Sequence, residues 1–140
     1  MKRVFADTSY WVAAINPSDQ WAEAVERATA RIGAASITTS LAVLVEVLNF
    51  FSTHGEELIV AAADAVSRIV SDEAVTVIET SMDDLGPALA LYRKRADQGY
   101  SLSDCISMDI LKRLKILDVL TSDSAYAHEG FRALLLARSW

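Results

Sequence analysis

Four acidic residues stand at positions from which a folded chain could bring their side chains together. They are Asp7, Glu46, Asp104 and Asp123. Carboxylates held close to one another repel unless cations neutralise them, and hard oxygen ligands select Mg²⁺ or Mn²⁺ over softer metals. Two such ions can activate a water molecule and stabilise the leaving oxygen of a phosphodiester. The residue types therefore predict a divalent-metal site for phosphodiester hydrolysis, which needs neither histidine nor cysteine.

Glu46 is the most informative of these residues because of its surroundings. It lies in the run from Leu41 to Leu48, which is apolar on all sides and predicts a largely buried helix. A buried carboxylate without a partner is costly or takes up a proton, and a nearby cation removes that cost. We therefore expect Glu46 to be a metal ligand. The alternative is a helix whose single polar edge faces solvent.

The three aspartates also have a simpler interpretation as helix caps. Asp7 follows the apolar run from Val4 to Ala6, and Asp123 precedes a short helical segment, so either could be an N-cap. Asp104 stands three residues after Ser101, as in a capping box, and suits the first turn of a helix. Taken singly, each aspartate reads better as a cap. The metal hypothesis depends on all four acids meeting at one edge of a sheet.

Other reactive side chains give weaker signals. Cys105 lies in an apolar helical segment and is expected to be a structural thiol, and His128 is expected at the surface. Ser9 lacks the glycine-flanked context of a hydrolase nucleophile. Asp109, which follows Asp104 by about a turn and a half, is a further candidate for the edge of the site.

Length and composition predict one domain that spans residues 1–140. They also exclude several classes of protein. The chain has a single cysteine, so no disulfide can form within it, as is usual in a reducing cytosol. The apolar run before Asp7 is too short for a signal peptide, and no stretch approaches the roughly 20 apolar residues that span a bilayer. A cytoplasmic protein without membrane contact is expected.

The net charge of −6 counts against purely electrostatic binding of nucleic acid. Without the four acids the sum is −6 + 4 = −2, which weakens that objection. Basic residues also cluster at positions 93–95 and 112–115. Each cluster is either a solvated helix face or a contact surface for nucleic acid.

Predicted strands and helices alternate along the chain. Apolar and β-branched runs predict strands at residues 4–6, 36–39, 75–78, 118–121 and 131–136. Capping residues and helical periodicity predict helices at 10–15, 41–53, 56–71, 81–96, 101–114 and 124–129. A further helix is expected to follow the turn at 16–19 and to end at about residue 31. This order predicts an α/β fold with a central parallel sheet flanked by helices on both faces. Functional residues of such sheets lie at the carboxyl ends of the strands, where Asp7 and Asp123 are expected.

Four stretches in a fixed order carry a resemblance to a known family. They are Val4–Trp11, Leu44–Phe51, Tyr100–Ser107 and Leu120–Tyr126, with Gly130-Phe131 behind the last. Together they resemble PIN-domain ribonucleases, and within that family the VapC-type toxins of prokaryotic type II toxin–antitoxin pairs. The resemblance covers essentially the whole chain. Tyr126 is a mild departure, because an aromatic residue, usually Phe, is expected there.

The resemblance implies the roles of several residues and partners. The four acids would bind Mg²⁺ or Mn²⁺ and carry catalysis, and Thr8 and Thr121 would place hydroxyl groups beside the site. The family further implies an endoribonuclease that cleaves structured RNA such as tRNA or rRNA. It implies a homodimer and a small antitoxin protein whose tail covers the site.

Three other functions remain open at this point. The domain could be a non-catalytic binding module whose acidic pocket accepts an arginine from a protein partner, because a guanidinium would also satisfy Glu46. It could instead be a PIN nuclease outside any toxin–antitoxin system. It could also be a nuclease directed at DNA that uses the same metals.

Overall fold

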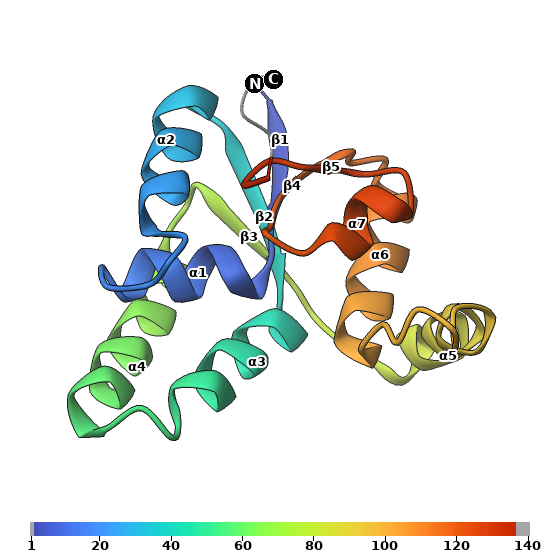
Figure 1. The fold of residues 1–140 in the computed structure, drawn as a ribbon, viewed down its shortest axis with the longest axis horizontal. Coiled ribbons are helices and arrows are strands. Elements are labelled where there is room, and N and C mark those ends of the chain that lie inside the picture. Colours follow the sequence, from blue (N-terminus) through green and yellow to red (C-terminus); the bar gives the residue numbers. More distant parts are fainter. Residues whose placement is uncertain (1, 137–140) are drawn as a thin grey trace.

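A five-stranded parallel sheet forms the centre of the molecule (Figure 1). The computed structural model describes residues 2–136. The strands are β1 (Arg3–Ala6), β2 (Ser36–Ser40), β3 (Val75–Ile78), β4 (Asp118–Leu120) and β5 (Arg132–Ala133). They lie in the order β3-β2-β1-β4-β5, and each neighbouring pair is parallel. Because all strands run the same way, their carboxyl ends meet at one edge of the sheet.

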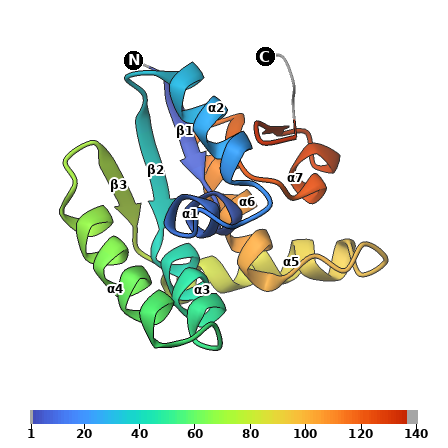
Figure 2. The same ribbon diagram turned by 60° about the vertical axis from the view of Figure 1, so that its left-hand side comes forward.

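Helices cover both faces of this sheet. They are α1 (Thr8–Ile15), α2 (Ala22–Ile32), α3 (Leu41–Phe51), α4 (Glu56–Ser71), α5 (Leu85–Lys94), α6 (Leu102–Leu114) and α7 (Ser124–His128), with a 3₁₀ turn η1 (Met82–Asp84) before α5. Figures 1 and 2 show α1, α2 and α4 on one side of the strands and α6 on the other. The predicted α/β fold is therefore confirmed. Within residues 2–136, no helix combines the length and apolar character needed to cross a membrane.

Apart from the charged residues at their starts, Arg3 and Asp118, the strands β1 and β4 are apolar because both of their faces are covered. Val4 and Phe5 of β1 and Val119 and Leu120 of β4 are fully buried. Strands buried on two faces read as continuous apolar runs, which is why β1 and β4 were visible in the sequence. The Asp7 amide donates to the Leu120 carbonyl at 3.1 Å, so the ends of these two strands are tied together.

Two predicted elements differ from the structure at their ends. The strand expected at 131–136 pairs regularly only over Arg132–Ala133. The helix expected at 81–96 begins as the turn η1, because Ser81 and Asp84 form a capping box there, and α5 ends at Lys94. The capping box is a local hydrogen-bond pattern that hydrophobic periodicity does not contain, and it sets the start of the helical segment.

The prediction that α3 is largely buried is wrong. Leu41, Val45 and Leu48 are between 38% and 48% exposed, and their spacing places them on one face of the helix. Val43, Leu44 and Val47 on the other face are buried in the core. We call the exposed set of Leu41, Val45 and Leu48 the α3 stripe.

Candidate active site

Asp7 is held at the end of β1 by two side chains from distant parts of the chain. It occupies the N-cap position of α1 but makes no side-chain cap hydrogen bond, so the cap interpretation is wrong for this residue. The Thr121 hydroxyl donates to Asp7 Oδ2 at 2.8 Å, and the Tyr126 hydroxyl donates to Oδ1 at 3.2 Å. Asp7 is only 4% exposed. This burial raises its pKa from 3.8 to about 6, although both hydrogen bonds favour the charged form.

Ser9 contributes a structural contact that the sequence analysis missed. Its Oγ accepts a hydrogen bond from the Ser122 amide at 2.9 Å, which links α1 to the segment after β4. Thr121 Oγ1 in turn accepts from the Asp123 amide at 3.1 Å. The hydroxyls beside Asp7 therefore fix the course of the chain that carries Asp123. The run of hydroxyl residues directly after Asp7 was the available signal.

Glu46 reaches the site from α3 and is half-buried. The Thr8 hydroxyl donates to Glu46 Oε1. The expectation of a deeply buried carboxylate is therefore corrected, because the polar edge of α3 faces a pocket and is partly open to solvent. The hydroxyl expected beside the site at Thr8 does lie there.

Asp104 and Asp123 complete the group from the opposite side. The Asp104 amide donates to Ser101 Oγ at 3.0 Å, and its carboxylate lies 3.5 Å from the Tyr126 hydroxyl. Burial, followed by the negative charges of Asp7 and Asp123, raises the pKa of Asp104 to about 7. Asp123 Oδ1 accepts from the Ala125 amide at 2.9 Å, so this aspartate does cap the helix that follows it.

All four acids line one pocket at the carboxyl edge of the sheet, with a volume of about 560 Å³. We call it the acid pocket. Its wall also includes Asp19, an acid that the sequence analysis did not select, and the aromatic residues Trp21 and Phe50. A neighbouring pocket of about 550 Å³ shares Asp104 and Asp123 with it and extends along α7. We call this second cavity the side pocket.

A family model for the PIN domain matches residues 4–131. The chain belongs to the PIN-domain family. Its structure is similar to that of the Mycobacterium tuberculosis protein VapC20, described as a toxin that cleaves the sarcin–ricin loop, with a TM-score of 0.83. The two chains are 22% identical, and the similarity covers 92% of this chain and 96% of the other. No curated protein sequence matched the chain. The extent of the domain, predicted as 1–140, stays a prediction.

The donor chemistry of the acid pocket in this PIN domain fits a hard divalent cation. Among the described residues that line it, none is Lys or Arg, so no basic side chain there balances the carboxylates. As they stand, no three carboxylate, histidine or cysteine side chains of residues 2–136 are arranged to hold one ion. Uncompensated carboxylates repel one another, and this repulsion adds to the larger effect of burial in raising the pKa of Asp104. Binding an ion would require these oxygens to move closer together.

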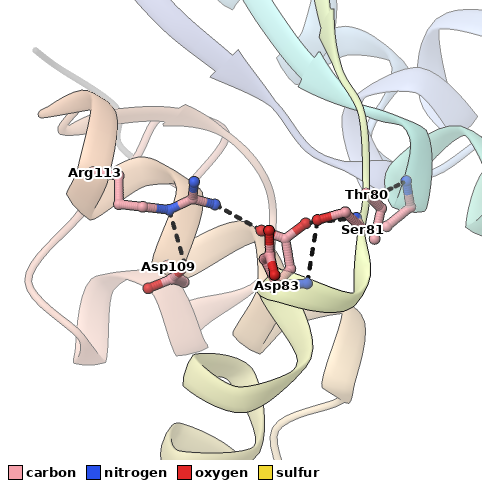
Figure 3. A network of polar contacts seen from close by, with 7 residues as sticks. Thr80, Ser81, Asp83, Asp109 and Arg113 are labelled. Atoms are coloured by element: carbon pink, nitrogen blue, oxygen red, sulfur yellow. Dashed lines mark hydrogen bonds and ion pairs between the residues drawn. The ribbon is translucent and has the colours of Figure 1, made fainter.

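Asp109, the further candidate for the edge of the site, does not line the acid pocket. Its Oδ2 accepts from Arg113 Nε at 3.0 Å (Figure 3). Arg113 also pairs with Asp84 at 2.8 Å. Five residues along a helix correspond to a rotation of about 140° beyond one full turn, which takes Asp109 away from Asp104. The hypothesis that Asp109 lies at the site is wrong.

The basic clusters contribute ion pairs to the framework of the domain. Arg95 donates to Glu129, whose Oε1 also accepts from the Tyr100 hydroxyl at 3.1 Å. The Arg95 hydrogen bond lowers the pKa of Glu129. These contacts tie the end of α5 to the end of α7 beside the side pocket. Cys105 is fully buried, as expected of a structural thiol, and His128 is exposed.

Proposed function

We propose that this PIN domain is a metal-dependent endoribonuclease that hydrolyses phosphodiester bonds in RNA. The observation that carries the proposal is the gathering of Asp7, Glu46, Asp104 and Asp123 around one pocket at the carboxyl edge of the sheet. Membership of the PIN-domain family supports it. The similarity in fold to a protein described as cleaving the sarcin–ricin loop supports RNA, with rRNA or tRNA as the expected class.

In this proposal the four acids would hold Mg²⁺ or Mn²⁺, and the ion would supply positive charge to polarise a water molecule and to stabilise the leaving oxygen. The chain's own hydroxyls orient the acids before substrate arrives. Thr121 and Tyr126 each donate to a different oxygen of Asp7, and Thr8 donates to Glu46. Carboxylates fixed in this way lose little free energy to reorganisation when the reaction occurs.

The same carboxylates link cation binding to pH. The pKa of Asp7 is about 6 and that of Asp104 about 7, so both groups hold protons at mildly acidic pH. A cation must displace these protons before it binds. We therefore expect Mn²⁺ affinity to fall as the pH drops below about 7.

RNA cleavage measured with and without EDTA, beside the variant Asp7→Asn, tests the proposal. The parent protein should cleave RNA with Mg²⁺ and lose this activity in EDTA. Asp7→Asn should be inactive, whereas Asp64→Asn should behave like the parent, because Asp64 is exposed on α4 outside the acid pocket. Cleavage by Asp7→Asn at the parental rate would show that the site is assigned wrongly. A calorimetric titration with Mn²⁺ that gives no signal would favour the arginine-accepting module.

We further propose that the protein is a cytoplasmic toxin of a type II toxin–antitoxin pair, inhibited by a small antitoxin. The support is the similarity in fold to VapC20, which is described as a toxin. Expression of the parent should arrest growth, and Asp7→Asn should not. Co-expression of a small protein encoded next to this chain should relieve the arrest. Growth arrest by Asp7→Asn as strong as that by the parent would contradict a nuclease toxin.

We propose that the chain forms a homodimer through the α3 stripe. The stripe leaves three large apolar side chains of one helix face exposed on the isolated chain, and a second copy would cover them. Sedimentation velocity should report a dimer for the parent and a monomer for Val45→Glu. The matched control is Val60→Glu, because Val60 is similarly exposed but belongs to α4. A monomeric parent would contradict this proposal.

A further inference from the structure

Two aromatic side chains share the acid pocket with the carboxylates. Trp21 and Phe50 both line it, and we call them the aromatic wall. Phe50 follows Glu46 by one turn of α3 and is 41% exposed. Its ring stacks on His54 with a centroid distance of 4.4 Å and an interplanar angle of 25°. An apolar ring is thus kept partly in solvent beside the proposed reaction centre, although burial of such a side chain is ordinarily favourable.

The charge of the molecule raises the question of how RNA would be held at this pocket. The chain carries a net charge of −6, and the described residues that line the acid pocket include no Lys or Arg. The described residues that line the side pocket include no Lys or Arg either. Contacts between basic side chains and phosphates, the usual source of affinity for nucleic acid, are therefore absent from both linings. Apart from the proposed metal ions, uncharged contacts have to supply the affinity close to the site.

Aromatic rings are the side chains that supply such contacts. Any nucleic-acid base can stack on an aromatic side chain, because every base presents a π-face. A base is free to stack on a protein ring only where it is unpaired, as in a loop, a bulge or a single strand. An aromatic wall beside the acids therefore fits an unpaired nucleotide better than a duplex.

The two pockets together give a strand a path across the acids. The acid pocket and the side pocket meet at Asp104 and Asp123. The side pocket then continues past Tyr100 and His128, whose rings lie edge to face with centroids 6.3 Å apart. A strand whose phosphate lies at the acids can thus place one neighbouring nucleotide on the aromatic wall and extend the other way into the side pocket.

We infer that Trp21 and Phe50 form a stacking platform for an unpaired RNA base next to the cleaved phosphate. The inference rests on the proposed ribonuclease function and adds two residues that would select an unpaired nucleotide beside the cleaved bond. Binding to this platform depends on stacking, so its contribution is insensitive to salt.

The test compares Trp21→Ala and Phe50→Ala with Tyr92→Ala. Tyr92 is a similarly exposed aromatic residue on α5 that lines neither pocket, so it is the matched control. A labelled single-stranded oligoribonucleotide is titrated in EDTA for the Kd and cleaved with Mg²⁺ for KM and kcat. Each platform variant should raise Kd and KM roughly 5- to 100-fold, the range expected when one base loses its aromatic partner, with kcat little changed. The ratio to the parent Kd should stay constant from low to high salt, and Tyr92→Ala should match the parent.

Folding is controlled separately because Trp21 is half-buried and packs against the core. Trp21→Phe keeps a ring and should restore binding that Trp21→Ala loses. Phe50→Ala changes a more exposed position, and its Mn²⁺ titration and thermal unfolding should match those of the parent. If the parent cleaves RNA but both alanine variants keep its Kd and KM, the inference is wrong and the proposed function stands. Equal binding of a perfect duplex of the same sequence would also overturn it. A parent that neither binds nor cleaves RNA would overturn the proposed function itself.

Discussion

Asp7 and Glu46 face the same pocket from two different settings. Asp7 stands at the end of a central strand, is 4% exposed and accepts hydrogen bonds from Thr121 and Tyr126. Glu46 projects from α3, is half-buried and accepts one from Thr8. The strand side of the pocket is therefore packed and fixed, whereas the helix side is open to solvent.

This difference shows that the domain provides rigidity for the charged groups and access for the substrate on two different sides of the pocket. The strand side fixes a carboxylate by burying it, and this burial raises the pKa of Asp7 to about 6. The helix side leaves Glu46 and the neighbouring Phe50 within reach of a large substrate. Rigidity is thus concentrated at the ends of β1 and β4, and access is concentrated along α3.

The largest expected effect is on turnover and should be common to both sides. We expect Asp7→Asn and Glu46→Gln each to lower the rate of RNA cleavage roughly 100- to 1,000-fold, the size seen when one electrostatic group of an active site is removed. Single-turnover cleavage with Mg²⁺ measures this. Asp109→Asn is the control, since Asp109 pairs with Arg113 outside the pocket. Full activity of Glu46→Gln would show that the helix side does not belong to the site.

Stability against pH should distinguish the two sides. The pKa of Asp7 in the folded chain, about 6, lies above its ordinary 3.8, so this group stabilises the fold fully below about pH 4 and this stabilisation is lost as the pH rises through about 6. Asp104, with a pKa of about 7, acts in the same direction. In EDTA, the free energy of unfolding should fall between about pH 5 and about pH 8, with Asp7 contributing on the order of 1–2 kcal/mol.

Denaturant unfolding of the parent, Asp7→Asn and Glu46→Gln at about pH 5 and about pH 8 checks this expectation. Asp7→Asn should lose part of the fall because the amide does not titrate and Asp104 supplies the rest, whereas Glu46→Gln should keep most of it. Parallel pH profiles for the parent and Asp7→Asn would contradict the view that the buried carboxylate on the strand side contributes to the fall in the free energy of unfolding.

A smaller effect is expected from the buried hydroxyl on the strand side. Tyr126→Phe removes the donor to Asp7 and keeps the ring that fills the core. We expect the affinity for Mn²⁺ to fall about 10-fold, as for other side chains that orient a metal ligand. Calorimetry measures it, and the exposed Tyr92→Phe provides the comparison. An unchanged affinity would mean that Thr121 alone is sufficient to orient Asp7.

The smallest effect is expected on the helix side. Thr8→Val removes the hydroxyl that donates to Glu46, but both residues are half-buried and water can replace the lost bond. The Mn²⁺ affinity should therefore change only about two- to threefold in the same titration. A loss for Thr8→Val larger than that for Tyr126→Phe would reverse the comparison between the two sides.

Most elements of the fold were predictable because their patterns are local. The apolar runs of β1 and β4 mark strands buried on two faces, and Ser40 caps α3 by accepting from the Val43 amide. The burial of α3 was predicted wrongly because its composition is apolar all round. Composition does not specify which face meets the core and which carries the α3 stripe.

The candidate site was predictable as a set of residues but not as an arrangement. The structure gathers the four acids that the sequence analysis selected, and their role as metal ligands stays a prediction. The cap interpretation was wrong for Asp7 and right for Asp123. Asp19 was missed because it reads as part of a turn, where its Oδ1 accepts from the Trp21 amide at 2.8 Å.

The sequence by itself determined the alternation of strands and helices and the acidic residues available at strand and helix ends, because hydrophobic periodicity and capping act over a few residues. Only the tertiary structure decided which side chains meet. Placing β4 beside β1 brings Thr121 and Tyr126 to Asp7 across more than a hundred residues of chain. It likewise brings Trp21 and Phe50 to one wall of the acid pocket. Contacts of this kind depend on strand order and packing, which no local pattern specifies.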